Sequence, residues 1–283
     1  MLKRTRTILI LAATILAVGC SRSTAPTEPT IWVTITPLKA LAEELTMGDF
    51  RVECLVPAGA SPESFEPTAR QIASLNDAEL LFSVGLIEFE HDLTANISSD
   101  HLINLSEGIT TLEGSCSHHH GHHSHGVDPH IWTAPRTLGQ MVDNMHRALK
   151  QHYPDSVKYD SAANRLLERI DSLDSYCRAC IDSSKLRAMM IYHPAYTYYA
   201  HDYHIDQIAI EHDGKEPTPK RLKSLIATAQ RLGIGHILLQ AQYSEDKVRS
   251  LARECNAEII VVDPLAEDII AEIERVTNII CGK

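Results

Sequence analysis

The sequence predicts an α/β protein of two lobes, each with a parallel sheet flanked by helices, joined by one long rigid helix. Short apolar segments rich in β-branched residues recur along the 283-residue chain, with helical stretches between them. This alternation is typical of parallel sheets that are covered on both faces. A central stretch without glycine or proline also carries an apolar stripe at helical spacing. Hydrophobic residues make up 44% of the chain, which favours a packed core over general disorder.

The first half of the chain contains segments for one such sheet and its helices. The expected strands are Ile31–Thr36, Val52–Val56 and Leu80–Val84. The expected helices are Pro37–Met47, Pro67–Asn76 and Pro135–His152. Each of these helices opens with a proline, whose missing N–H costs little in the first helical turn.

The middle of the chain is expected to form a single long helix from Ser156 to Ser184. Its apolar stripe consists of Tyr159, Ala163, Leu166, Leu167, Ile170, Leu173, Cys177 and Ile181. At 1.5 Å per residue such a helix would extend roughly 40 Å, enough to run along the whole molecule. Pro154 separates it from the preceding helix. The sequence leaves one alternative open, a single doubly wound domain with a long surface helix.

The second half of the chain repeats the alternation and predicts the second sheet. The expected strands are Ala188–Tyr192, Gln207–Ile210, His236–Leu239 and Glu258–Val262. The expected helices are Thr218–Leu232, Ser244–Cys255 and Glu267–Cys281. These segments complete a second α/β unit of the same kind as the first.

The first twenty residues resemble a bacterial lipoprotein signal. Three basic residues precede an apolar run over residues 8–18, and Gly19 and Cys20 follow it. The run is shorter than the roughly 20 residues that a membrane-spanning helix needs, so a secretory signal is expected. The resemblance implies cleavage before Cys20 and lipidation of that cysteine. An ordinary signal with an incidental cysteine is the alternative.

These features divide the chain into five parts. We expect a signal peptide at residues 1–19, a lipidated tether at 20–30, an N-terminal metal-binding lobe at 31–152, a linking helix at 153–184 and a C-terminal lobe at 185–283. The tether is rich in Ser, Thr and Pro, which favours a flexible connection. Removal of the signal would take three basic and no acidic residues, and would change the net charge from −11 to −14. This acidity argues against a nucleic-acid binder, because phosphate contacts need a surplus of Lys and Arg.

Six cysteines lie beyond the proposed lipidation site, and export makes disulfides possible. Cys255 and Cys281 are the first candidates for a pair, because both lie in the last lobe. Cys177 and Cys180 have CxxC spacing, but they fall within the long helical stretch. Redox and zinc CxxC sites usually lie at turns or helix starts, so we expect buried or partly buried thiols here.

A dense histidine segment points to metal capture. The chain has 16 histidines, and a loop expected at residues 115–127 holds six of them among glycines and serines: His118, His119, His120, His122, His123 and His125. Such a segment cannot bury a core, and neutral imidazole is a good ligand for zinc, copper or nickel. We interpret it as a mobile accessory metal loop, with a solvated segment as the alternative.

Three further residues lie where parallel sheets place their ligands. His193 and Asp263 come at or just past the ends of expected strands, and His130 follows the histidine segment. Open α/β sheets bind ligands at the carboxyl ends of their strands. One such residue alone is usually a helix cap or a core group, but three of them favour a metal site.

The chain is similar to the metal-binding proteins of zinc and manganese ABC importers, the ZnuA/TroA-like family. Five motifs carry the resemblance, which extends over nearly everything after residue 30: Gly59–Pro67 (GASPESFEP), Asp128–Trp132 (DPHIW), Tyr192–Tyr199 (YHPAYTYY), Glu216–Leu222 (EPTPKRL) and Asp263–Leu265 (DPL). The family has two α/β lobes bridged by a long helix, with one metal ion in the cleft between them. The histidine segment before DPHIW resembles that of the zinc branch.

The resemblance implies a ligand set of Glu63, His130, His193 and Asp263. Glu63 departs from the family pattern, which commonly has histidine at this position. A carboxylate can bind zinc, but water or a loop histidine could take the place instead. Gln240 also departs from the pattern, because a glutamate often follows this strand in the family, and a charge behind the ligands is therefore expected to be missing.

The resemblance implies capture of Zn2+ outside the cytoplasmic membrane and delivery to an ABC permease and its ATPase. It implies an exported, lipid-anchored monomer on the periplasmic or extracellular face, which is not an enzyme and does not bind nucleic acid. Two nitrogens and two oxygens form a harder site than three histidines, so Mn2+ or iron is the first alternative. A metal-storing or adhesin lipoprotein and, last, a zinc metalloenzyme are the others. No HExxH or other hydrolase motif is present in the sequence.

Overall fold

A computed structural model describes residues 28–93, 97–114, 126–185, 187–212 and 214–283 of the chain. The signal peptide, Cys20, most of the tether and the six histidines of the accessory loop lie outside the described residues. No helix within the described part of the chain is long and apolar enough to cross a membrane.

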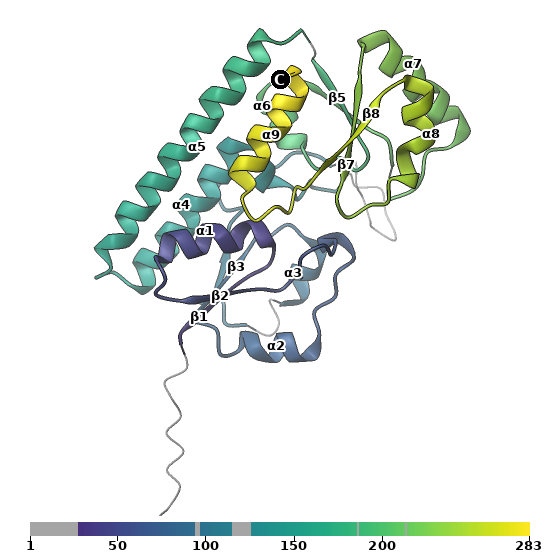
Figure 1. Ribbon diagram of the computed structural model, residues 1–283. Helices are drawn as coiled ribbons and strands as arrows, with labels where there is room; N and C mark the ends of the chain where they lie inside the picture. The colour runs from purple at the N-terminus through teal and green to yellow at the C-terminus, as the bar shows by residue number, and fades with distance from the viewer. Residues whose placement is uncertain (1–27, 94–96, 115–125, 186, 213) are drawn as a thin grey trace, which may run out of the picture.

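Two four-stranded sheets, all of whose pairs are parallel, form the framework of the two lobes (Figure 1). The first sheet has the order β2-β1-β3-β4, with β1 at Thr30–Val33, β2 at Arg51–Cys54, β3 at Leu80–Ser83 and β4 at Leu102–Asn104. The second has the order β6-β5-β7-β8, with β5 at Ala188–Ile191, β6 at Asp206–Ala209, β7 at His236–Gln240 and β8 at Glu258–Val262. The predicted two-lobe fold class is confirmed, and the single doubly wound alternative is wrong.

The seven expected helices are observed with bounds that differ by at most two residues at each end. The helices are α1 at Thr36–Thr46, α2 at Ala69–Leu75, α3 at Glu88–Leu93, α4 at Pro135–His152, α5 at Val157–Ser183, α6 at Thr197–Asp202, α7 at Pro219–Leu232, α8 at Asp246–Cys255 and α9 at Ile269–Cys281. Side chains set several starts: Thr68 accepts from the backbone N–H of Gln71 and moves the start of α2 past Pro67. β4, α3 and α6 were not predicted, because segments of three to six residues carry too little periodicity.

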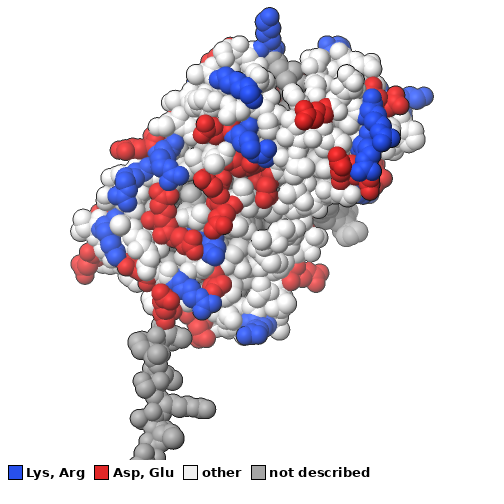
Figure 2. Space-filling model, in the orientation of Figure 1, with Lys and Arg blue, Asp and Glu red and all other residues white. Residues whose placement is uncertain are grey.

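The long helix α5 spans 27 residues and has no side-chain cap at its start. Packing therefore stabilises it, chiefly against α4 and α9 (Figure 1). Its outer face is charged, and Figure 2 shows basic and acidic side chains intermixed over this side of the molecule. Arg169 on this face contacts Glu44 of α1 at 2.7 Å. The amphipathic stripe thus buries one side of α5 and leaves the other in solvent.

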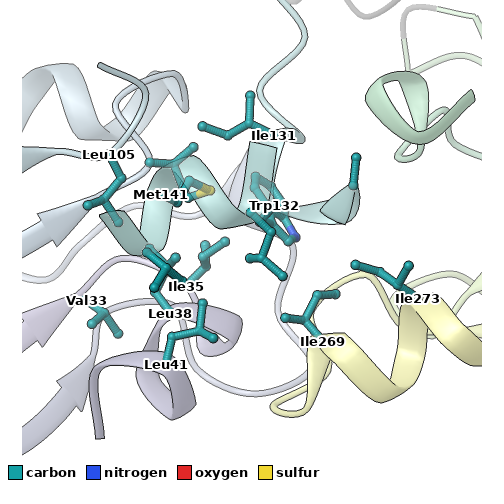
Figure 3. Packing of buried hydrophobic residues seen from close by; sticks show 14 of the residues in the cluster. Val33, Ile35, Leu38, Leu41, Leu105, Ile131, Trp132, Met141, Ile269 and Ile273 are labelled. Carbon is teal, nitrogen blue, oxygen red and sulfur yellow. The ribbon is translucent and has the colours of Figure 1, made fainter. Parts of the chain in front are cut away.

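One hydrophobic cluster extends across both lobes. Figure 3 shows Leu38 and Leu41 of α1, Trp132 beside α4, and Ile269 and Ile273 of α9 packed together. The same cluster includes residues of β5, β7 and β8 in the second sheet. A shared core of this kind restricts movement of one lobe against the other.

The structure does not bring the expected cysteine pair together. Cys255 packs at the edge of a second hydrophobic cluster, between the outer face of the second sheet and helices α7 and α8. Cys281 packs against the first cluster at the end of α9, where the thiol next to it is that of Cys180. Cys177 and Cys180 are buried within α5, as the sequence predicted.

Candidate metal centre

Three of the four expected ligands converge between the lobes. Glu63 lies in the short 3-10 helix Pro62–Ser64, His130 directly precedes a second 3-10 helix, and His193 follows β5. His193 Nε2 lies 2.9 Å from Glu63 Oε1 and 3.4 Å from His130 Nε2. Among the described residues, this is the one group of three possible ligands whose donor atoms all lie within 4.8 Å of one another.

The site is enclosed but reaches solvent through Glu63. The exposed fractions of His130 and His193 are 5% and 4%, whereas the Glu63 side chain is 18% exposed. The cleft is also lined by Trp132, Gln242 and Tyr243, and the Tyr243 ring centre lies 6.0 Å from that of His193. Burial raises the pKa of Tyr243 to about 12, so its phenol stays neutral beside the site.

Buried carboxylates orient both histidine rings. Asp128 Oδ1 lies 2.9 Å from His130 Nδ1, and Glu211 Oε1 lies 2.7 Å from His193 Nδ1. A carboxylate at Nδ1 accepts the ring proton and leaves the Nε2 lone pair for a metal ion. Both Nε2 atoms face the space that Glu63 also faces. The pairs therefore preset two imidazole donors toward one point.

Asp128 is held in its ionised form despite its burial. Burial by itself raises the pKa of this carboxyl group, but the charge and hydrogen bonds of His130 and the Thr197 hydroxyl outweigh burial and lower it. Thr197 Oγ1 donates to Asp128 Oδ2 at 2.6 Å, and the backbone N–H of His130 donates to Oδ1 at 2.9 Å. An ionised Asp128 can accept the His130 ring proton continuously.

Sequence reasoning missed Glu211, which supplies the charge that Gln240 lacks. Gln240 contacts the backbone of His193 on both sides: its Oε1 accepts from the His193 N–H at 3.2 Å, and its Nε2 donates to the His193 carbonyl oxygen. It therefore fixes the position of His193 while Glu211 polarises the ring. Glu211 lies two residues past the end of β6. A position just after a parallel strand is the same signal that points to His193 and Asp263.

Asp263 stands apart from the other three. It directly follows β8, and its Oδ1 accepts from Gln242 Nε2 at 2.9 Å and from the Leu265 N–H at 3.0 Å. Its own backbone N–H donates to Glu272 Oε1 at 2.7 Å. Ligation by Asp263 stays a prediction, because its carboxylate is outside the group whose donor atoms converge.

The base of the accessory loop lies beside the centre. Glu113 and Val127 form an isolated antiparallel bridge, and the Gly114 N–H donates to the Gly126 carbonyl oxygen at 2.7 Å. Asp128, the partner of His130, follows this bridge directly. The loop histidines themselves lie outside the described residues, and their role stays a prediction.

Two preset imidazole nitrogens and one carboxylate oxygen, mostly buried, fit a divalent first-row cation such as Zn2+. Two of the three ligands come from the first lobe and one from the second, so a bound ion would join the lobes.

Comparison with known proteins agrees with this geometry. A family model described as ZnuA, the periplasmic component A of a zinc-uptake complex, matches residues 31–274. A zinc-binding lipoprotein AdcA of Streptococcus pneumoniae is 25% identical over 93% of this chain and 56% of its own length. A zinc-binding protein AdcA of Streptococcus pyogenes is 25% identical over 82% of this chain and 49% of its own length. The chain thus spans about half the length of these curated relatives.

Solved structures extend the comparison to the fold. A crystal structure of ZnuA is 29% identical with a TM-score of 0.80, and the match covers 90% of this chain and 98% of that one. A zinc-bound deletion mutant of ZnuA is also 29% identical, with a TM-score of 0.79 over 89% of this chain and 96% of that one. The family model covers most of the sequence and all the elements that carry the site. The chain belongs to the ZnuA family of periplasmic zinc-uptake components.

Proposed function

We propose that the protein captures Zn2+ outside the cytoplasmic membrane and delivers it to the permease of an ABC importer, which an ATPase drives. The convergence of Glu63, His130 and His193 at the junction of the lobes carries this proposal. A buried site with ligands from both lobes suits capture of a single ion. The zinc-binding relatives and the zinc-bound ZnuA structure support the choice of cargo.

The proposed ligand set is Glu63, His130, His193 and Asp263. The first three already face one another. Asp263 would join by exchanging its hydrogen bond with Gln242 for the metal ion, while its Leu265 contact keeps the loop in place. Four protein ligands would close the coordination shell and leave no open position for a reacting water, as in non-catalytic zinc sites. A role in binding and transport, and not in catalysis, follows from this set.

The two imidazole donors favour Zn2+ over Mn2+, which prefers carboxylate, carbonyl and water oxygens. The six histidines of the proposed accessory loop, whose flanking residues Glu113 and Val127 pair with each other, would add ligands of the same kind. The two carboxylates in the set reduce this preference for Zn2+ over Mn2+, so the binding of both ions has to be measured.

Export and a lipid anchor at Cys20 complete the proposal, with residues 1–19 removed and residues 20–30 as the tether. The lipid would hold the protein, as a monomer, at the cell envelope near the permease. A relative described as a zinc-binding lipoprotein supports this arrangement.

Release of the ion is proposed to need rearrangement of ligands rather than wide opening of the lobes. One hydrophobic cluster and the helix α5 connect the lobes, so a large hinge motion would break a continuous core. Glu63 and Asp263 are attached to short or irregular segments, whereas each histidine is fixed by a buried carboxylate. The two carboxylate ligands are therefore the ones expected to move at the permease.

Competition titration of the purified protein against a chromophoric chelator tests the proposal. Zn2+ should bind with a dissociation constant well below micromolar and more tightly than Mn2+. The double variant His130→Ala/His193→Ala should lose this binding. The matched control His101→Ala/His152→Ala removes another histidine pair, whose ring centres lie 6.1 Å apart, and should keep it. Wild-type affinity weaker than micromolar, or unchanged affinity in the double variant, would refute capture.

Growth tests separate transport from storage. Deletion of the gene should slow growth in zinc-poor medium, and the wild-type gene should restore growth where the His130→Ala/His193→Ala variant does not. Equal growth with and without the gene would argue for a storage or adhesive role.

A further inference from the structure

A pair of thiols lies at the contact of α5 with α9, separate from the metal centre. Cys180 is on the last turns of α5 and Cys281 is the final residue of α9. Burial, and after it the neighbouring Cys180 thiol, raises the pKa of the Cys281 thiol to about 12, which places the two side chains next to each other. Figure 1 shows α5 and α9 running side by side toward the C-terminus, and the two helices pack closely.

The register of the two helices brings these cysteines together. One turn earlier, Cys177 Sγ lies 3.1 Å from Thr277 Oγ1, and the Tyr176 hydroxyl donates to Asn278 Oδ1. Figure 1 shows that α5 and α9 run in the same direction, so the helices are parallel at this contact. One helical turn further on, Cys180 reaches Cys281. The pairing is thus set by two helices of 27 and 13 residues and does not depend on a loop.

The two thiols differ in access. Cys180 is 2% exposed, whereas Cys281 is only partly buried at the end of the chain. The Lys283 ammonium group lies 5.3 Å from the centre of the Tyr176 ring, and the nearby Cys180 thiol raises the pKa of Lys283. An external reagent would therefore meet Cys281 first, with Cys180 directly behind it.

Other partners for these thiols are less favourable. Cys177 is engaged by Thr277, and Cys255 belongs to the second hydrophobic cluster. A thiolate metal site is also disfavoured, because the described residues offer one group of three converging ligands and it contains no cysteine. Cys180 and Cys281 remain as a pair.

We propose that Cys180 and Cys281 form a disulfide that fastens the last helix to the linking helix once the chain meets a disulfide donor. The donor class is glutathione disulfide or the disulfide of a thioredoxin-like protein. That the chain meets such a donor outside the cytoplasm rests on the proposed export. The bond formation itself can be tested without that assumption.

Thiol–disulfide exchange would form the bond in two steps. Cys281 gives up its proton and attacks one sulfur of the donor, the donor's S–S bond breaks, and its other sulfur leaves and takes up a proton. Cys180 then gives up its proton and attacks the Cys281 sulfur, and the second donor sulfur leaves and is protonated. The two cysteines lose two electrons together, and the donor disulfide becomes two thiols.

The disulfide would close a covalent loop around the second lobe. The chain between Cys180 and Cys281 contains β5 to β8 and α6 to α8. Long loops lose the most chain entropy in the unfolded state when they are closed, so the bond should stabilise this lobe. Glu272 in the first turn of α9 accepts the Asp263 N–H, so fastening α9 also secures the segment that presents Asp263.

Thiol counting and non-reducing peptide mapping of the purified full chain test the proposal, with glutathione disulfide as the donor. After treatment, the wild type should show two fewer alkylatable thiols than the reduced protein, and one peptide should link Cys180 to Cys281. Cys281→Ser should show no such loss of two thiols. The matched control Cys255→Ser, at the end of α8, should behave as the wild type.

A thermal readout on the treated wild type provides a second test that does not depend on the folding of a variant. Reduction of the treated wild type should lower its Tm by several degrees, whereas reduction should leave the Tm of Cys281→Ser unchanged. Peptides that join a different cysteine pair, or two full thiols at Cys180 and Cys281 after treatment, would overturn the proposal. Zinc affinity is measured on the same samples, so loss of the disulfide and loss of metal capture are distinguished.

Discussion

Replacement of Glu211 by glutamine tests whether the carboxylate behind His193 tunes the metal centre. Glu211 is 3% exposed and its Oε1 lies 2.7 Å from His193 Nδ1. Glutamine keeps the size of the side chain and one oxygen acceptor, but it removes the charge that makes His193 a stronger donor. The change therefore isolates electrostatic support from packing.

The expected loss follows from the burial of the pair. Water cannot replace the carboxylate at this depth, and removal of such partners typically lowers metal affinity by about 10- to 100-fold. Because the glutamine oxygen can still accept the Nδ1 proton, Glu211→Gln should lie near the tenfold end, about 1.4 kcal/mol. Glu211→Ala, which loses the acceptor as well, should approach a hundredfold.

Chelator competition with Zn2+ measures the affinity, and thermal unfolding of the metal-free variants shows that they fold. Glu258→Gln is the matched control, because Glu258 also faces a histidine: its Oε2 lies 3.9 Å from His236 Nε2 and its side chain is 74% exposed. The control should change affinity less than about twofold, since exposed pairs of this kind contribute little. An affinity for Glu211→Gln within twofold of the wild type, or an equal loss in the control, would refute the reasoning.

Four further measurements test other parts of the structure. Zn2+ at a hundred times its dissociation constant should stabilise the fold by about 2.7 kcal/mol, and a chelator should reverse the rise in Tm. Gly85→Ala should destabilise the fold by about 3 kcal/mol and Gly108→Ala by about 1 kcal/mol. Both glycines have positive φ, but only at Gly85 would an added Cβ overlap a side chain, which belongs to β4. Trp132→Phe should cost about 2 kcal/mol, since it leaves the Pro264 carbonyl oxygen without the indole N–H that donates to it at 2.7 Å. Burial raises the pKa of the Cys54 thiol from 9.0 to about 11. The free energy of unfolding should therefore fall as pH rises through this interval, because the unfolded chain loses the thiol proton first. In Cys54→Ser the free energy of unfolding should fall less steeply with pH.

The sequence predicted the fold well where the elements are long or strongly patterned. The helix at Pro135–His152 and the strand at Glu258–Val262 have the expected bounds, and α5 differs by one residue at each end. Periodicity is a sum over many residues, so it fails for β4, which has three residues. Such short elements form because neighbouring strands pair with them, and a local pattern does not contain that information.

The candidate site was predictable to the extent that chain position fixes spatial position. His193 follows a buried strand, and parallel topology brings the ends of such strands to one edge. Glu211 carries the same signal but was missed, because β6 is a partly buried strand and an acidic residue after a strand is usually solvated. The sequence could not show that Gln240 contacts the backbone of His193, since that depends on side-chain direction between β5 and β7.

The way the ligands are held also indicates how capture and release can coexist in a molecule whose lobes share a core. Each histidine is fixed twice, by a carboxylate on its ring and by contacts to its backbone. Glu63 lies in a helix of three residues. The side chain of Asp263 accepts one hydrogen bond from Gln242 and one from the Leu265 backbone N–H. Histidines that carboxylates already hold in place favour tight capture, because little ordering of side chains is needed when the ion binds. Carboxylates on short segments can leave one at a time, so that loss of the ion requires only local motion and the continuous hydrophobic cluster stays intact.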